Sequence, residues 1–371
     1  MIVKLGSLIS EYSVRNKADE DIPVYSVTNE QGFCTGYFSK EVASQDRTTY
    51  KIVPRGCFAY NPSRINVGSV DVQECEDRVI VSPLYVVFSV DEKLNRRYLL
   101  HYLKSDITLT YIKAYASGSV RDNLKFSILK DFPINLPSAE EQEQIVATLD
   151  GIEHLIALRK EEIASLDELV KSRFIELFGD LKSNPHNWQY KNLLDVADID
   201  TVMVNDYEKY ADYPHIGIDS IEKNTGRLFG YRTIAEDGVI SGKYLFTARH
   251  IIYSKIRPNL NKVALPDFDG LCSADAYPIL PKENVCLRIY LGYVMRSEFF
   301  LDYILPFSRR ANMPKVNKEQ LSGFNLPVPD IELQRQFATF VEQTDKSKLA
   351  VQKALEELEI LKKSLMQQYF G

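Results

Sequence analysis

The sequence predicts an α+β protein built from two modules, each a mixed globular domain followed by one long helix. The first observation is an internal repeat: Asn135-Leu136-Pro137 recurs as Asn325-Leu326-Pro327, and Phe178-Gly179 recurs as Phe370-Gly371. The second is a heptad pattern of apolar residues that precedes each Phe-Gly pair. The offset, about 190 of the 371 residues, is too long for a solenoid repeat and fits a whole domain plus a helix.

The globular domains are predicted to be mixed, with short strands predominating. Alternating apolar runs predict strands at Val79–Val81, Tyr85–Phe88 and His250–Tyr253, and a helix is predicted at Arg97–Ser105 with its repeat at Leu291–Asp302. The predicted limits along the chain are residues 1–137 for the first domain, 138–180 for the first long helix, 181–327 for the second domain and 328–371 for the second long helix.

The two long helices have clear sequence signals. Ser138 with Glu141 forms a capping box after Pro137, and Gly179 is suited to a left-handed helix end. In both helices a 4,3 spacing predicts a coiled-coil seam, interrupted only by basic residues. The seam positions are Ile145, Leu149, Ile152, Ile156, Ile163, Leu166, Val170 and Leu177, then Phe337, Val341, Thr344, Val351, Leu355, Leu358, Leu365 and Tyr369.

Further apolar residues lie beside this seam and widen the apolar stripe beyond what two helices cover. They pack against the protein's own domains or they form a surface on which a partner protein docks, and the sequence leaves both open. The positions predicted to bind a partner are Leu155, Leu169, Phe174, Phe340 and Leu361.

Charge is distributed unevenly over the predicted segments. The chain has a net charge of −6, but residues 138–180 alone carry 11 acids against 4 bases. Each globular domain has one base in excess, 17 against 16 in the first and 18 against 17 in the second. The acidic groups therefore concentrate on the first helix, and the domains can approach a polyanion.

No catalytic or metal-binding pattern stands out. The five cysteines form no CxxC pair and the five histidines form no HxxxH pair, which predicts no metal site. P-loop, dinucleotide-binding, zinc-protease and serine-hydrolase motifs are absent, so we predict no enzymatic activity for this chain. Without a signal peptide or a membrane-spanning run, the sequence predicts a soluble cytoplasmic protein with reduced thiols.

What remains is a pair of basic, amide-rich stretches in each domain. Arginine and lysine read guanine, asparagine reads adenine, and these residues also anchor phosphates, so the mixture suits DNA recognition. Any one of these residues could instead belong to a solvated loop. The predicted DNA-binding residues are Tyr60, Asn61, Arg64, Asn66, Arg121, Asn123 and Lys125 in the first domain, and Arg249, Tyr253, Lys255, Arg257, Asn259, Asn261, Lys262, Arg309, Arg310, Asn312 and Lys315 in the second.

The ends of the first long helix carry a family resemblance. Glu140-Glu141-Gln142 opens the helix and Leu177-Phe178-Gly179-Asp180 ends it. Together with the Asn-Leu-Pro segments and the duplicated helices, these residues resemble the specificity subunits of Type I restriction-modification systems over the whole chain. The second helix departs from the pattern, because it begins Ile331-Glu332-Leu333-Gln334.

The resemblance implies two target recognition domains, each reading one half of a bipartite, asymmetric site in double-stranded DNA. It implies that the two helices pair as an antiparallel coiled coil, act as a spacer and hold two methyltransferase subunits, with restriction subunits outside them. S-adenosylmethionine, ATP and Mg²⁺ would bind those partners, so this chain would hold no cofactor and contact no membrane. The competing interpretation is a non-catalytic coiled-coil scaffold whose two domains bind proteins. A truncated fused restriction enzyme is disfavoured by the intact second repeat.

Overall fold

The computed structural model describes residues 1–36, 47–116, 123–308 and 314–371. The chain divides into two compact units. Unit 1 is Met1–Glu162 together with Val351–Gly371, and unit 2 is Ile163–Ala350. The long helices α4 (Ala139–Phe178) and α9 (Ile331–Phe370) each contribute residues to both units.

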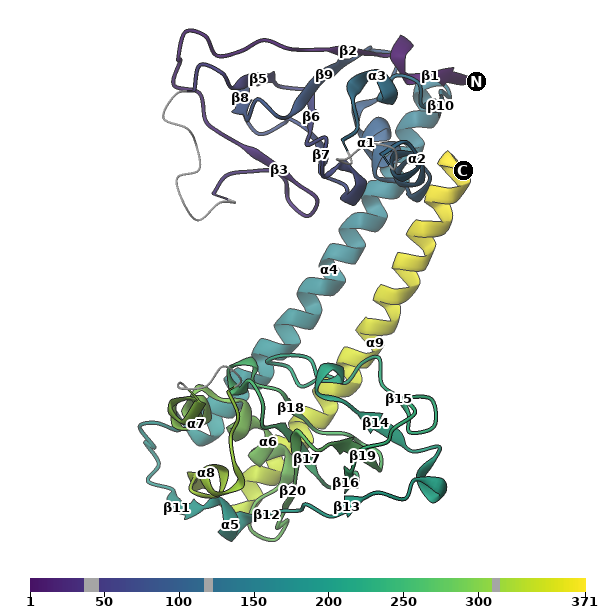
Figure 1. Cartoon of the computed structure of the whole chain (residues 1–371). Helices are drawn as coiled ribbons and strands as arrows, with labels where there is room; N and C mark the ends of the chain where they lie inside the picture. The colour runs from purple at the N-terminus through teal and green to yellow at the C-terminus, as the bar shows by residue number, and fades with distance from the viewer. Residues whose placement is uncertain (37–46, 117–122, 309–313) are drawn as a thin grey trace. The chain divides into compact units, whose positions relative to one another are not determined.

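Unit 1 is built on a four-stranded antiparallel sheet in the order β2-β9-β6-β7 (Figure 1). Phe58, Tyr60 and Phe88 from this sheet are fully buried with Tyr98 of α1, which forms one core. The elements of unit 1 are β1 (Ile2–Lys4), η1 (Leu5–Ser7), β2 (Ile9–Glu11), β3 (Ser26–Thr28), β4 (Gly32–Cys34), β5 (Lys51–Pro54), β6 (Phe58–Tyr60), η2 (Ile65–Val67), β7 (Val70–Val72), β8 (Arg78–Val81), β9 (Val86–Val90), α1 (Arg96–Lys104), α2 (Asp106–Ala116), α3 (Phe126–Leu129) and β10 (Pro133–Asn135).

Unit 2 repeats this sheet in the order β12-β20-β17-β18 and adds a five-stranded sheet, β13-β16-β19-β14-β15. Its elements are β11 (Gln189–Asn192), α5 (Leu193–Val196), β12 (Ala197–Ile199), β13 (Met203–Val204), η3 (Glu208–Tyr210), β14 (Pro214–Ile216), η4 (Ile218–Ser220), β15 (Arg232–Thr233), β16 (Lys243–Phe246), β17 (Ile251–Ser254), η5 (Pro258–Leu260), β18 (Val263–Ala264), β19 (Gly270–Ser273), β20 (Ala276–Pro281), α6 (Arg288–Arg296), α7 (Glu298–Ile304), η6 (Leu305–Ser308), α8 (Lys318–Ser322) and β21 (Asn325–Val328).

One buried glutamine near the start of each long helix ties that helix to its own domain. Gln142 accepts a hydrogen bond from Asn95 N at 2.7 Å and donates to Pro137 O at 3.1 Å. Gln334 does the same with Leu287 N at 2.8 Å and Pro329 O at 2.8 Å. At the starts of the long helices the duplication therefore extends to individual hydrogen bonds.

These bonds correct the register of the sequence repeat. The Asn-Leu-Pro match pairs Pro137 with Pro327, whereas the glutamine contacts pair Pro137 with Pro329. Tyrosine bonds agree, since Tyr98 donates to Asn135 O and Tyr290 donates to Pro327 O. The letter match is two residues out because the spatially equivalent residues differ in type.

The helix signals read from the sequence are confirmed with one exception. Ser138 N donates to Glu141 at 3.0 Å and Glu141 N donates to Ser138 Oγ at 3.2 Å, and Gly179 follows the helix with φ of 73°. The helix predicted at Leu291–Asp302 is instead two helices, α6 and α7. Ser297 separates them, because its hydroxyl accepts a hydrogen bond from Phe300 N and so begins a new helix.

The long helices pair in antiparallel fashion within each unit. In unit 1 Lys362 binds Glu153 at 2.7 Å and Lys160 binds Glu359 at 3.5 Å, while in unit 2 Lys348 binds Asp167 at 2.5 Å. The predicted seam positions are all buried or half-buried. This confirms the predicted coiled coil. Among the described residues, no helix has the length and apolar character needed to cross a membrane.

Candidate nucleic-acid interface

One predicted basic stretch of each domain falls on the same turn of the duplicated sheet. In unit 1 the turn joins β6 to β7 through η2, and in unit 2 it joins β17 to β18 through η5. A second segment, just before the short helix α3 or α8, lies against each turn. Leu124 N donates to Pro62 O at 3.1 Å, and Val316 N donates to Lys255 O at 2.8 Å. The structure thus brings together the described parts of the two stretches predicted in each domain.

In unit 1 this arrangement borders an open hollow of about 790 Å³. Pro62, Asn123 and Lys125 line it together with Glu11 and Lys130. The side chains of Arg64, Asn123 and Lys125 are exposed, and those of Asn61 and Asn66 are half-exposed. The polar side chains that line the hollow therefore come from the second segment, from β2 and from the residues after α3, while the turn contributes Pro62.

Tyr60 does not belong to this surface. Its ring is fully buried, and its hydroxyl donates to Leu124 O at 3.1 Å. Burial raises the pKa of this hydroxyl above its ordinary value, so it stays protonated. We correct the sequence-based assignment: Tyr60 positions the second stretch and has no surface with which to contact DNA.

In unit 2 the turn has an unusual backbone. Arg257 and Asn261 flank η5 with φ of 48° and 46°, the left-handed region that residues other than glycine rarely occupy. Arg257 N donates to Pro314 O at 2.8 Å, which holds this conformation. Such strain is retained where the surroundings enforce it, frequently at functional sites. The side chains of Arg257 and Asn259 point to solvent, and Lys315 on the adjoining segment is exposed as well.

Other predicted residues of unit 2 have structural roles. Tyr253 is buried against Phe300, with ring centroids 5.5 Å apart, and Asn261 is buried with its amide donating to Arg296 O at 2.7 Å. These two assignments are corrected for the same reason as Tyr60. Half-buried Lys262 donates to Ile218 O at 2.7 Å, and Arg249 is exposed at the turn before β17. The predicted residues Arg121, Arg309, Arg310 and Asn312 lie outside the described residues.

The residues predicted to bind a partner divide into two groups. Leu155, Leu169 and Leu361 have 43%, 49% and 46% of their surface exposed. Phe174 is instead buried in the core of unit 2, where its ring contacts Phe178, Tyr290, Tyr293 and Phe337. The assignment of Phe174 is therefore corrected. Phe340 is half-buried beneath the guanidinium of Arg173, 5.7 Å from its ring centroid.

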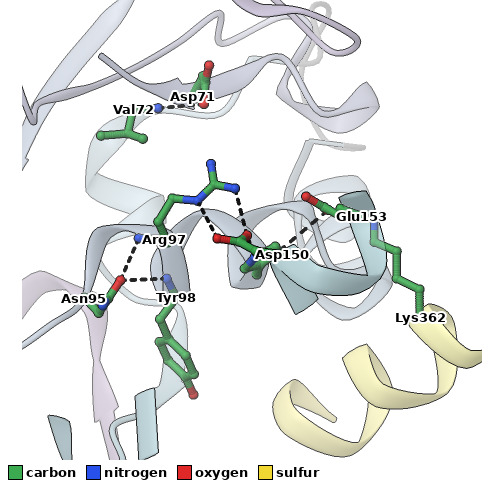
Figure 2. Close-up of polar contacts among 9 residues, drawn as sticks. Asp71, Val72, Asn95, Arg97, Tyr98, Asp150, Glu153 and Lys362 are labelled. Atoms are coloured by element: carbon green, nitrogen blue, oxygen red, sulfur yellow. Dashed lines mark hydrogen bonds and ion pairs between the residues drawn. The ribbon is translucent and has the colours of Figure 1, made fainter. Parts of the chain in front are cut away.

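Sequence reasoning missed an ionic cluster in unit 1 where α1, α4 and α9 meet (Figure 2). Buried His101 lies 2.8 Å from Asp150 and 3.8 Å from Glu153, and the ligand atoms of these three residues lie within 4.8 Å of one another. Arg97 binds Asp150 at 2.8 Å and Lys362 binds Glu153 at 2.7 Å. Both carboxylates are thus already neutralised by cations. The cluster is an ion network that joins three helices.

The fold and the paired turns define a class: internally duplicated α+β proteins in which two modules share one pair of long helices. The family model described as the Type I restriction modification DNA specificity domain matches residues 6–168 and again residues 185–360. The chain belongs to this family.

Named relatives and solved structures agree with this. The chain is 37% identical over 198 residues to the Type I restriction enzyme EcoDI specificity subunit of Escherichia coli, which covers 52% of this chain and 43% of that protein. It is 23% identical over 300 residues to the MjaVIII specificity subunit of Methanocaldococcus jannaschii, covering 72% and 68%. The chain therefore spans less than half the length of the first relative.

Two solved structures show the same fold. The S subunit of a Type I restriction-modification system from M. genitalium aligns with a TM-score of 0.59 at 15% identity, covering 100% of this chain and 96% of that one. A chain from a structure of the assembly of a type I R-M system aligns with a TM-score of 0.56 at 16% identity, covering 100% and 97%.

Proposed function

We propose that this chain is the sequence-specific DNA-recognition subunit of a Type I restriction-modification complex. In this proposal residues 1–137 and 181–327 are two target recognition domains, and each reads one half of a bipartite, asymmetric site. The observation that carries the proposal is the turn that occurs twice on one frame with different side chains, Asn61 and Arg64 in one unit and Arg257 and Asn259 in the other. Two different readers recognise two different half-sites.

The charge distribution supports this role. The first long helix is strongly acidic and repels the DNA backbone, which keeps the duplex on the domains. Each domain has only one base in excess, so the isolated chain binds DNA weakly. Methyltransferase subunits complete the grip on DNA.

The long helices, residues 138–180 and 328–371, serve as a spacer and as a docking platform for two methyltransferase subunits. Leu155, Leu169 and Leu361 support this, because exposed leucines beside a filled seam favour association. Restriction subunits join the same complex. The chain itself catalyses nothing and holds no cofactor: S-adenosylmethionine, ATP and Mg²⁺ belong to the partner subunits.

The proposal is tested by mapping methylated adenines in DNA exposed to the complete complex. The wild-type chain should direct methylation to one bipartite motif. Arg257→Ala should relax one half of that motif and Arg64→Ala the other, each reducing discrimination by about 1–3 kcal/mol. The two variants serve as controls for each other. Loss of specificity in both halves from either substitution would contradict the assignment of one reader to each domain.

Docking is tested separately with Leu155→Glu. A carboxylate within an apolar contact is desolvated without a partner, so we expect methyltransferase binding to weaken by about 1–3 kcal/mol. Thr148→Glu adds the same charge at an exposed polar position of α4 and should bind as wild type does. Sedimentation at saturating methyltransferase measures both affinity and stoichiometry. One methyltransferase per chain would exclude the proposed ratio of two.

A further inference from the structure

Lys255, directly after β17, is fixed by its main chain on both sides. Its N–H donates to Asp275 O at 3.0 Å, and its carbonyl accepts from Val316 N at 2.8 Å. The residue therefore belongs to the rigid sheet of unit 2, at the point where the turn towards Arg257 begins. The Lys255 side chain therefore extends from a backbone that hydrogen bonds hold in place.

The ammonium group of Lys255 lies over two tyrosine rings. Its nitrogen is 4.9 Å from the ring centroid of Tyr277 on β20 and 5.9 Å from that of Tyr244 on β16. The two rings come from the two different sheets of unit 2. The residue is only 8% exposed, yet within the described residues its ammonium has no hydrogen bond and no carboxylate within ion-pair distance. Ring faces stabilise a cation but leave its three N–H donors unused.

Lys243 provides a comparison for the ammonium environment of Lys255. It is equally buried, at 8% exposure, but its ammonium donates to Ser241 O at 2.9 Å and to Ser241 Oγ at 2.7 Å. Lys315, which is exposed, has an ion pair with Asp275 at 3.1 Å. Burial lowers the pKa of Lys255 and the charge of Lys315 lowers it further, only partly offset by Asp275.

We infer that the Lys255 ammonium is a base-reading donor that binds the O6 and N7 acceptors of a guanine in the half-site of the second domain. The inference rests on the proposed function and specifies the chemistry of one of its two readers. A lysine that only neutralises phosphate is typically exposed, as Lys315 is, because a phosphate is reached from many directions. The ammonium of Lys255 instead lies over two rings on a largely buried side chain, which suits a contact that must discriminate between bases.

The test is to produce the chain with its methyltransferase subunits and to map methylated adenines for the wild type, Lys255→Met and Lys243→Met. The wild-type motif should contain a guanine in the second half-site. Lys255→Met should make that one position degenerate, with discrimination reduced roughly 5- to 150-fold and every other position unchanged. Lys243→Met removes an equally buried lysine and should leave the motif intact.

Two further measurements make the outcome decisive. Lys255→Arg retains two guanine-directed donors, so the recognised motif should keep its guanine. This variant separates loss of base reading from loss of stability if Lys255→Met lowers the melting temperature. Placing 7-deazaguanine at the identified position should weaken binding of the wild type and leave Lys255→Met unaffected. An unchanged motif in Lys255→Met, or a uniform loss of methylation at every site, would overturn base reading while leaving the proposed function standing. A wild-type complex without a bipartite motif would remove the proposed function and this inference with it.

Discussion

In both units the same hydrogen bonds hold the long helices, but the side chains packed beside these bonds differ. Gln142 and Gln334 make matching contacts, and so do Tyr98 and Tyr290. Next to them, unit 1 places His101 in an ion network, whereas unit 2 places Tyr293 in an aromatic cluster with Phe337, ring centroids 5.0 Å apart. Equivalent positions are therefore occupied by charged groups in unit 1 and by aromatic rings in unit 2.

This difference shows which contacts define the frame. The shared bonds of each pair run from a side chain to main-chain atoms, which every sequence provides, so they survive divergence of the surrounding residues. The side chains beside these bonds need only to fill the available volume and to have hydrogen-bond partners for their own polar groups. A duplicated protein can thus change the chemistry of a junction without changing its shape.

The largest expected loss of stability concerns the aromatic cluster of unit 2. Phe174→Ala should destabilise unit 2 by about 3–5 kcal/mol, because truncation leaves a cavity among four rings. Hydrogen exchange resolved by residue should show faster exchange in unit 2. Leu155→Ala, an exposed position on the same helix, should change stability by less than about 0.5 kcal/mol. Equal losses from both variants would mean that the aromatic cluster does not hold unit 2 together.

The shared glutamines should be equivalent to each other. Gln142→Leu and Gln334→Leu each leave a part-buried main-chain N–H and carbonyl groups without partners, so each should cost about 2–3 kcal/mol in its own unit. Residue-resolved hydrogen exchange again separates the two units. If one substitution were harmless and the other severe, the frame would be held differently in the two units despite its matched bonds.

The smallest expected effect is a pH dependence of the stability of unit 1, caused by the ion network around His101. Burial lowers the pKa of His101 below the ordinary 6.5, only partly offset by Glu153 and Asp150. Below about pH 6.5 the unfolded chain therefore binds a proton that the folded chain does not, and unit 1 loses stability as pH falls through this range, by less than about 1 kcal/mol near pH 6.

His101→Gln should flatten this dependence. At lower pH Asp150 acts in the same direction: burial raises its pKa, but hydrogen bonds from Arg97 and His101 hold it below the ordinary 3.8, and protonation then removes its ion pairs. Unfolding free energies measured from pH 7.5 to 5 would show the change. Parallel curves for wild type and His101→Gln would mean that the histidine is not the titrating group.

The sequence predicted those features that depend on local chemistry. Ser138 and Gly179 mark the ends of α4 because a capping side chain and a left-handed residue act on their immediate neighbours. The seam was predictable because heptad spacing alone decides which helix positions face each other. The two basic stretches of each domain were recognised by composition, and the bond from Leu124 N to Pro62 O shows that those of unit 1 meet.

Features that depend on distant partners were not predictable. Tyr60 and Tyr253 stand within polar stretches, yet each ends in the core because its strand turns that face inward. The ion network joins His101 to Asp150 across two helices, and no spacing rule connects them. The caged position of Lys255 requires rings from two sheets whose strand order, β12-β20-β17-β18 and β13-β16-β19-β14-β15, is set by long-range pairing.

The ring of Phe370, 5.1 Å from that of Tyr98, has a consequence for the order in which the protein is made. Unit 2 is one continuous stretch, Ile163–Ala350, so all of its residues are translated before Val351–Gly371. Unit 1 needs Val351–Gly371, which supplies Met366 and Phe370 to its core. Although it is translated first, the N-terminal module must wait for its final helix, and its partly covered apolar surface needs protection throughout that interval.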